Sequence, residues 1–206
     1  MNKNVKKILR AIVINLIVAL FSAISIIILI NLFFGKGINR TFSLLNKFEI
    51  DTSKKNKVET TIDSNNTIKN YPEYGTKYAT IEIPKIGVNL PVYFGDTLEI
   101  LRNGIGHSSG SYFPGEGGSI IYMGHNSEDM LRNLGDAKID DKIVVKTSYG
   151  EYIYKIYNTE IVNEKEYEKL PVQSNKEILM LYTCYPFKNI GYTTNRYVVY
   201  AELVKL

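Results

Sequence analysis

The chain has 206 residues, 45% hydrophobic and 22% charged, which suits one ordinary folded domain with an additional segment. Residues 1–71 carry 11 Lys+Arg against 4 Asp+Glu, a net charge of +7, and residues 72–206 carry 14 against 17, a net charge of −3. The acidic second part argues against a nucleic-acid partner. One cysteine excludes an internal disulfide, and one cysteine with two histidines is too few for the usual structural zinc site.

The first predicted element is an apolar helix over residues 11–34. No charged residue occurs between Arg10 and Lys36, and 24 helical residues at about 1.5 Å each cover a hydrocarbon core of about 30 Å. The run is too long for a cleaved secretory signal, and it ends in bulky residues, so we expect an uncleaved transmembrane anchor. A small excess of positive charge before it favours a cytoplasmic segment 1–10 and a single-pass cell-membrane protein with its folded domain outside the cytoplasm.

Residues 35–70 are rich in Lys, Asn, Ser and Thr and poor in large apolar side chains. Such a composition buries too little apolar surface to order itself, so this segment is predicted to be an extracytoplasmic stalk. The folded domain is then expected to occupy residues 71–206.

The folded part consists of short β-branched and aromatic runs separated by Gly, Pro, Asn and Asp, a pattern typical of strands. The hairpin signal at Gly150 and only two short helical signals, at 96–104 and 127–136, indicate a mainly β barrel or sandwich. The predicted strands are residues 78–84, 89–94, 118–125, 142–148, 151–162, 177–184 and 196–204.

Cys184 is the only cysteine, and by itself a cysteine on an apolar strand is more often packed and inert than reactive. Its position favours a functional role. The apolar run before it stops at Thr183, and Tyr185 and Pro186 cannot continue a central strand, so Cys184 is expected at a strand end facing a loop. A cysteine nucleophile requires a basic or cationic neighbour to supply its thiolate.

The chain offers two histidines and one well-placed arginine as such neighbours. His125 ends another apolar strand and is the better general base, whereas His107 lies in a Gly/Ser-rich stretch and either stabilises that loop or lines the substrate site. Arg196 opens the last strand, where a return of the chain would bring it beside Cys184 to stabilise an oxyanion. Each residue alone also has a structural explanation, and no Asp or Glu stands out as a third triad member.

Four stretches make the chain similar to the sortase family of cysteine transpeptidases, and most like its class D members. These stretches are residues 79–93, 106–125, 181–184 and 195–203. The TLxTC signature of the family appears here as Met180-Leu181-Tyr182-Thr183-Cys184, with methionine in the first position.

The resemblance implies a closed eight-stranded β-barrel in which Cys184 is the nucleophile, His125 the general acid and base, and Arg196 the residue that holds substrate and oxyanion. Thr183 and His107 are expected to bind substrate, with no metal and no cofactor. The implied partners are secreted proteins with an LPxTG-like sorting signal, cleaved after threonine, and an amine of peptidoglycan or its precursor as acceptor.

Two other functions remain open from the sequence. The same Cys-His pair would serve a thiol peptidase that uses water as acceptor, although no carboxamide that would orient the histidine is evident. An anchored binding barrel without catalysis, in which Cys184 only packs, is the third reading.

Overall fold

The structure, a computed structural model, describes residues 7, 9–10, 12–26, 28–29, 59–169, 174, 176–188 and 193–205. It divides into two units, residues 1–46 and 47–206. In the first unit, residues 12–26 are helical with exposed apolar side chains. Within the described ranges, no helix combines the length and apolarity needed to cross a membrane. Residues 11, 27 and 30–34 of the predicted span lie outside the described residues.

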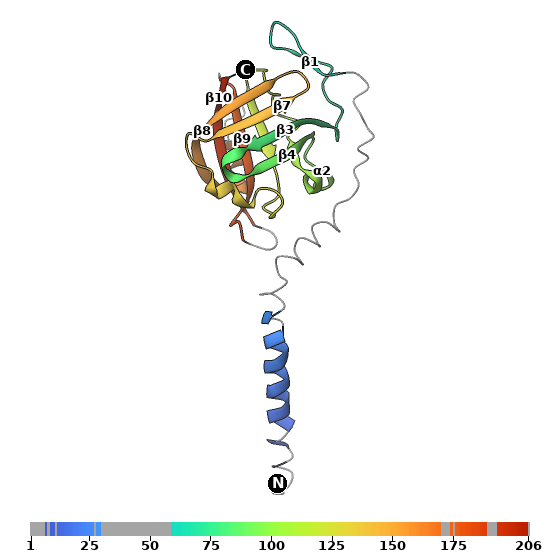
Figure 1. Ribbon diagram of the computed structural model, residues 1–206, viewed down its shortest axis with the longest axis vertical. Coiled ribbons are helices and arrows are strands. Elements are labelled where there is room, and N and C mark those ends of the chain that lie inside the picture. The colour runs from blue at the N-terminus through green and yellow to red at the C-terminus, as the bar shows by residue number, and fades with distance from the viewer. Residues whose placement is uncertain are drawn as a thin grey trace. The chain divides into compact units, whose positions relative to one another are not determined.

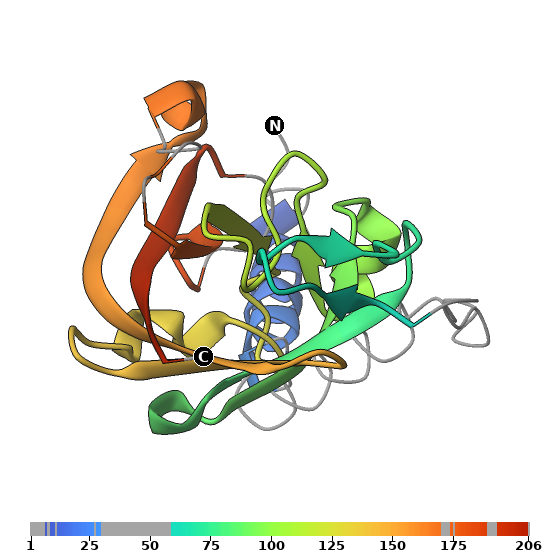
Figure 2. The ribbon, with the colours of Figure 1, turned by 90° about the horizontal axis from the view of Figure 1, so that it is seen from above.

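The second unit is built on a closed barrel of eight strands, in the order β10-β8-β7-β3-β4-β5-β6-β9, which confirms the predicted barrel (Figure 1). Neighbouring strands pair antiparallel except β4 with β5 and β6 with β9, which pair parallel. Figure 2 shows the long β8 (orange) curving beside β10 (red). The barrel strands are β3 (Lys77–Ile83), β4 (Val88–Phe94), β5 (Ile105–His107), β6 (Ser119–Met123), β7 (Lys142–Thr147), β8 (Glu151–Asn163), β9 (Ile178–Tyr185) and β10 (Asn195–Lys205).

Helices are short, as the sequence indicated. The helix α2 (Leu98–Asn103) begins after Thr97, whose side chain accepts a hydrogen bond from the Ile100 N–H, and it buries Ile100. The second helical signal forms turns that lead into the 3₁₀ helix η2 (Arg132–Asp136), not an α-helix. Two further 3₁₀ helices are η1 (Pro84–Ile86) and η3 (Glu164–Lys169).

The folded unit begins earlier than the predicted boundary at residue 71. Strands β1 (Thr61–Ile62) and β2 (Ile68–Lys69) form a small hairpin, and Ile68 is buried in the main core. Ser148 donates a hydrogen bond to the Thr60 carbonyl, which ties this hairpin to the turn between β7 and β8. The part of the predicted stalk at residues 59–70 is therefore folded, because it buries more apolar surface than its composition suggested, and residues 35–58 lie outside the described residues.

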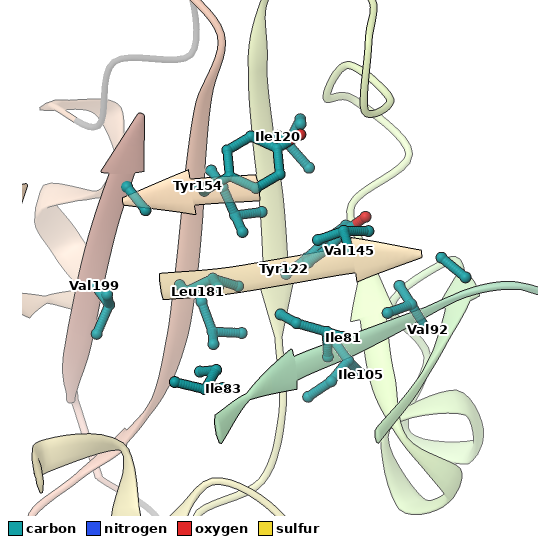
Figure 3. Packing of buried hydrophobic residues seen from close by; sticks show 14 of the residues in the cluster. Ile81, Ile83, Val92, Ile105, Ile120, Tyr122, Val145, Tyr154, Leu181 and Val199 are labelled. Carbon is teal, nitrogen blue, oxygen red and sulfur yellow. The ribbon is translucent and has the colours of Figure 1, made fainter. Parts of the chain in front are cut away.

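Alternation along the strands separates two apolar clusters on opposite faces of the barrel wall. The main cluster takes residues from all eight barrel strands, so it fills the barrel interior (Figure 3). From β9 it contains Leu179 and Leu181, and from β10 it contains Val199. The smaller cluster contains the intervening residues Met180 and Val198. Because successive side chains of a strand point to opposite faces, this second cluster lies on the outer surface of the barrel, over β6, β8, β9 and β10.

Candidate active site

Cys184 lies one residue before the end of β9 and is partly exposed. It is two residues beyond Tyr182 and four beyond Met180, both of which belong to the outer apolar cluster. The period of two along a strand therefore directs Cys184 to the outer face of the barrel. The sulfur is thus on the outer wall near the strand ends, not inside the cylinder.

Arg196 is the residue directly opposite Cys184 in the antiparallel ladder between β9 and β10. Side chains of directly paired residues share one face, with Cβ atoms about 5 Å apart. Arg196 is also two residues before Val198 of the outer cluster, which gives the same orientation. The predicted thiol and guanidinium groups are therefore neighbours on adjacent strands.

His125 follows the end of β6, on the other side of β9. The parallel register pairs Met123 with Tyr182, and the Gly124 N–H donates to the Tyr182 carbonyl at 3.1 Å, so the pairing continues past the end of β6. Two residues beyond Met123, the register reaches Cys184, and His125 is level with it. When the register is extended in this way, His125, Cys184 and Arg196 follow one another across three neighbouring segments.

The backbone around His125 is held closely against the barrel. Thr183 Oγ1 donates to the Gly124 carbonyl at 2.8 Å, and the Leu131 N–H donates to the His125 carbonyl at 3.0 Å. A Cβ atom at residue 124 would lie 2.7 Å from Ile105 Cδ1 and 2.9 Å from Leu131 Cδ1, so glycine permits this close approach. These contacts fix the position from which the imidazole projects.

The pKa of His125 is lowered from its ordinary value of 6.5. Partial burial of the imidazole is the largest cause, the positive charge of Arg102 on α2 lowers the pKa further, and the negative charge of Asp129 opposes both. At neutral pH the imidazole is therefore mainly uncharged and able to accept a proton, as a general base requires.

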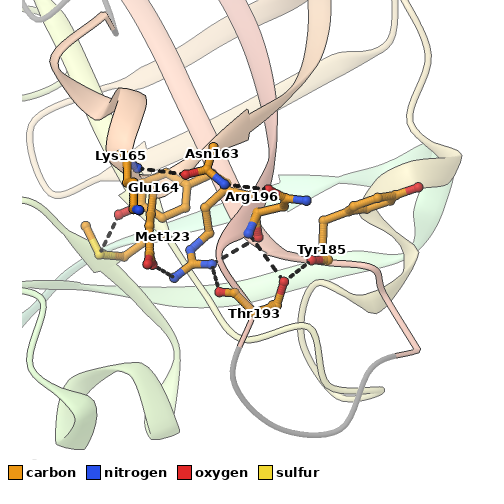
Figure 4. Close-up of polar contacts among 9 residues, drawn as sticks. Met123, Asn163, Glu164, Lys165, Tyr185, Thr193 and Arg196 are labelled. Atoms are coloured by element: carbon orange, nitrogen blue, oxygen red, sulfur yellow. Dashed lines mark hydrogen bonds and ion pairs between the residues drawn. The ribbon is translucent and has the colours of Figure 1, made fainter.

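The guanidinium of Arg196 is anchored on the segment at the start of its own strand and on η3 (Figure 4). Its Nη1 donates to the Thr193 carbonyl and, at 3.0 Å, to the Asn195 carbonyl. Its Nη2 lies 3.4 Å from a carboxylate oxygen of Glu164. Three of the five N–H donors are thereby engaged, and the Nε–H and the second Nη2 hydrogen make no hydrogen bond within the described part of the chain.

His107 does not line the substrate site, which corrects the expectation that it binds substrate. Its side chain is 0% exposed, because it lies in β5 among aromatic rings of the barrel interior. Both ring nitrogens are engaged: Nδ1 with the Tyr78 hydroxyl at 2.8 Å and Nε2 with the Ser111 hydroxyl at 2.9 Å. Of the two roles considered from the sequence, these contacts match stabilisation of the loop.

Thr183 is also buried, with its hydroxyl directed to the Gly124 carbonyl rather than to the surface. In this structure it joins the strand of the thiol to the residue before His125. Its buried hydroxyl therefore holds these two segments of the site together.

Three charged residues at the site were not identified from the sequence. Glu164 contacts Arg196, and Arg102 and Asp129 act on His125 through their charges. No motif distinguishes these residues from ordinary surface charges. Glu164 alone could have been found, and only from the β8–β10 ladder. The pairing of Asn195 with Asn163 in that ladder places Glu164 near the start of β10.

The residues that the structure describes contain no group of three His, Cys, Asp or Glu side chains able to hold a metal ion. Three carboxylates of the folded unit illustrate this, because each has a separate partner. Glu116 accepts from the Tyr71 hydroxyl, Asp140 pairs with Lys155 and Asp141 accepts from the Lys138 N–H.

A thiol between an imidazole and a guanidinium is suited to acyl transfer through a covalent intermediate. The imidazole can move a proton from the thiol to a leaving amine, and the guanidinium can stabilise the negative charge that develops on the attacked carbonyl oxygen. The chemistry requires no metal or cofactor.

Comparisons with known proteins indicate the family of the chain. A family model described as "Sortase domain" matches residues 81–204. The chain is 34% identical over 169 residues to "Sortase D" of Bacillus subtilis (strain 168), a match that covers 80% of this chain and 85% of that protein.

Solved structures give the same result. A Clostridium perfringens Sortase D5 transpeptidase superposes with a TM-score of 0.58 at 27% identity, covering 66% of this chain and 83% of that chain. A lid mutant of sortase A from Corynebacterium diphtheriae superposes with a TM-score of 0.56 at 29% identity, covering 63% and 70%. The chain therefore belongs to the sortase family of cysteine transpeptidases and is most similar to class D.

Proposed function

We propose that the protein is a membrane-anchored transpeptidase that cleaves an LPxTG-like sorting signal after threonine and transfers the secreted protein to an amine of peptidoglycan or its precursor. The observation that carries this proposal is the direct pairing of Cys184 with Arg196 across β9 and β10, with His125 two residues beyond the last residue of β6 that pairs with β9. Membership of the sortase family supports transpeptidation as the reaction class.

In the proposed first step, the Cys184 sulfur attacks the threonine carbonyl carbon of the signal. A C–S bond forms and the C–N bond to glycine breaks, and His125 gives the thiol proton to the departing amine. Arg196 stabilises the oxyanion with the guanidinium donors that have no partner among the described residues.

In the second step, an incoming amine attacks the thioester carbonyl. His125 accepts a proton from that amine and returns it to the sulfur as the C–S bond breaks. A new amide links the protein to the acceptor, and the enzyme is regenerated without any change in oxidation state.

Anchoring through residues 11–34, with the barrel outside the cell, is part of the same proposal. It rests on the uncharged apolar run between Arg10 and Lys36. Membrane fractionation of the full chain before and after deletion of residues 1–34 tests it. Release of the truncated protein from the membrane fraction is expected, and equal fractionation of both forms would contradict an anchor.

The reaction is tested by incubating the protein with an LPxTG-type peptide and a small amine. A new amide product, identified by mass spectrometry, is expected to increase with amine concentration. If the peptide is only hydrolysed, and neither the rate nor the product changes when the amine is added, the protein is a thiol peptidase with water as acceptor. No reaction, together with unchanged behaviour of Cys184→Ala, would indicate a barrel that only binds.

A further inference from the structure

The ion pair between Arg196 and Glu164 is more buried than the pair of Arg132 and Glu128. The Arg196 side chain is 14% exposed and that of Glu164 is 26% exposed, whereas the pair of Arg132 and Glu128 has exposures of 32% and 41%. A pair withdrawn from water is screened less than an exposed one, and it fixes its partners more firmly.

Hydrogen bonds that do not involve Arg196 hold the backbone of Glu164 in place. The Glu164 N–H donates to the Thr194 carbonyl at 2.7 Å. Next to it, the Asn163 side chain donates to Asn195 Oδ1 at 3.0 Å and accepts from the Lys165 N–H at 3.1 Å. These bonds hold the first residue of η3 against the first residues of β10 (Figure 4).

The guanidinium is therefore hydrogen-bonded at two nitrogens, to two backbone carbonyls through Nη1 and to one carboxylate through Nη2. Carbonyl oxygens alone would leave the guanidinium free to turn about its last side-chain bonds. The carboxylate adds a charged contact at a second nitrogen, which restricts that rotation and leaves the two remaining donors in a defined direction.

We infer that Glu164 is a positioning residue: it acts through Arg196, holding the guanidinium so that its unoccupied donors meet the carbonyl oxygen attacked by Cys184. The inference rests on the proposed function and deepens it. Glu164 touches neither substrate nor sulfur in this account. Its contribution is to the orientation of the group that stabilises the oxyanion, and orientation of such donors is a large part of their effect.

The test compares Glu164→Gln with Glu160→Gln, a matched control. Glu160 lies on β8, carries the same charge and accepts a hydrogen bond from the Tyr200 hydroxyl rather than from Arg196. With active sites counted by alkylation of Cys184, Glu164→Gln is expected to lower kcat about tenfold with KM within about twofold, because the lost interaction belongs to the transition state. Glu160→Gln is expected to match the unmodified protein.

A double-mutant cycle with Arg196→Ala separates positioning from a general structural effect. Single-turnover acylation by the peptide, followed by mass spectrometry, is measured for the four proteins. If Glu164 acts through Arg196, Glu164→Gln costs less than about twofold once Arg196 is absent. An equal loss in both backgrounds, or a normal kcat for Glu164→Gln alone, would overturn the inference.

The Tm values of the same four proteins test the ion pair without an activity assay. The two substitutions together are expected to lower Tm by less than the sum of their separate effects, since either one breaks the pair. Additive Tm changes would show that the Arg196 and Glu164 side chains do not interact, which would overturn the inference. If the unmodified protein forms no amide product while the Tm values are non-additive, the proposed function fails and the ion pair stands.

Discussion

Arg196 lies directly across the β9–β10 ladder from Cys184, so the two side chains project from neighbouring strands onto the same outer face of the barrel. This pairing follows from backbone hydrogen bonds and needs no long loop to bring the groups together. It also means that the charge on Arg196 acts on chemistry at the sulfur from a rigid support.

Arg196→Lys is expected to lower kcat by about 100-fold or more, because an ammonium keeps the charge but cannot reproduce the planar fork of the guanidinium. The measurement is amide formation per active site, counted by alkylation of Cys184. Turnover close to that of the unmodified protein would remove Arg196 from the catalytic residues.

His125→Ala and His107→Ala are expected to affect different properties of the protein, the first its activity and the second its stability. The first should lose nearly all activity with little change in stability, since the imidazole is the only proton carrier proposed at the site. The second should lose about 2–4 kcal/mol of unfolding free energy, because it leaves a cavity and removes the buried hydrogen bonds to the Tyr78 and Ser111 hydroxyls. Urea unfolding and activity per folded molecule check both, and a reversed ranking of activities would mean that the wrong histidine is assigned to catalysis.

The environment of His125 predicts a titration midpoint below 6.5 in the free protein. Replacing Arg102 by Gln removes a positive charge that opposes protonation, so the midpoint should rise. Replacing Asp129 by Asn should lower it. NMR of the imidazole protons measures both midpoints. The other histidine, His107, does not interfere, because burial lowers its pKa to about 3 and it does not titrate in the same range. A fall in the midpoint for Arg102→Gln would contradict this electrostatic account.

Burial of neutral His107 makes stability depend on pH. Its pKa is lowered to about 3 in the folded state, against an ordinary value of 6.5, so the unfolded chain binds the extra proton between these values. The contribution of neutral His107 to the free energy of unfolding is complete above pH 6.5. As the pH falls below 6.5, this contribution decreases by up to about 1.4 kcal/mol per pH unit. His107→Gln, which cannot take up this proton, should show a shallower loss between pH 6.5 and 5 in urea unfolding. Parallel pH profiles for the two proteins would refute this coupling.

The sequence predicted the seven longer barrel strands well, because their apolar runs are long and are ended by glycine, proline or polar residues. It missed β5, a strand of only three residues, Ile105–His107, two of which are glycine and histidine. All three are buried, and β5 is recognised only by its neighbours β4 and β6. It also missed β1 and β2, two residues each, which depend on contacts with the barrel for their order.

For the site, the sequence predicted Cys184, His125 and Arg196 because each stands at the margin of an apolar strand, and the structure places Cys184 and Arg196 opposite each other in the β9–β10 ladder. It could not determine that they face the outer wall, since this depends on which alternating set of residues fills the closed barrel. His107 and Thr183 were misplaced because a polar side chain near a catalytic residue gives no sign in the sequence of being buried. The contact of Glu164 with Arg196 required the β8–β10 register.

The most direct test of the central claim is to trap the covalent intermediate. The protein is mixed with an LPxTG-type peptide, quenched in acid within one turnover and analysed by intact-mass and peptide-mapping mass spectrometry. The account predicts an adduct equal to the peptide through its threonine, attached to Cys184, absent in Cys184→Ala and released by added amine as an amide. Product formation with no adduct on Cys184, or undiminished product in Cys184→Ala, would contradict it.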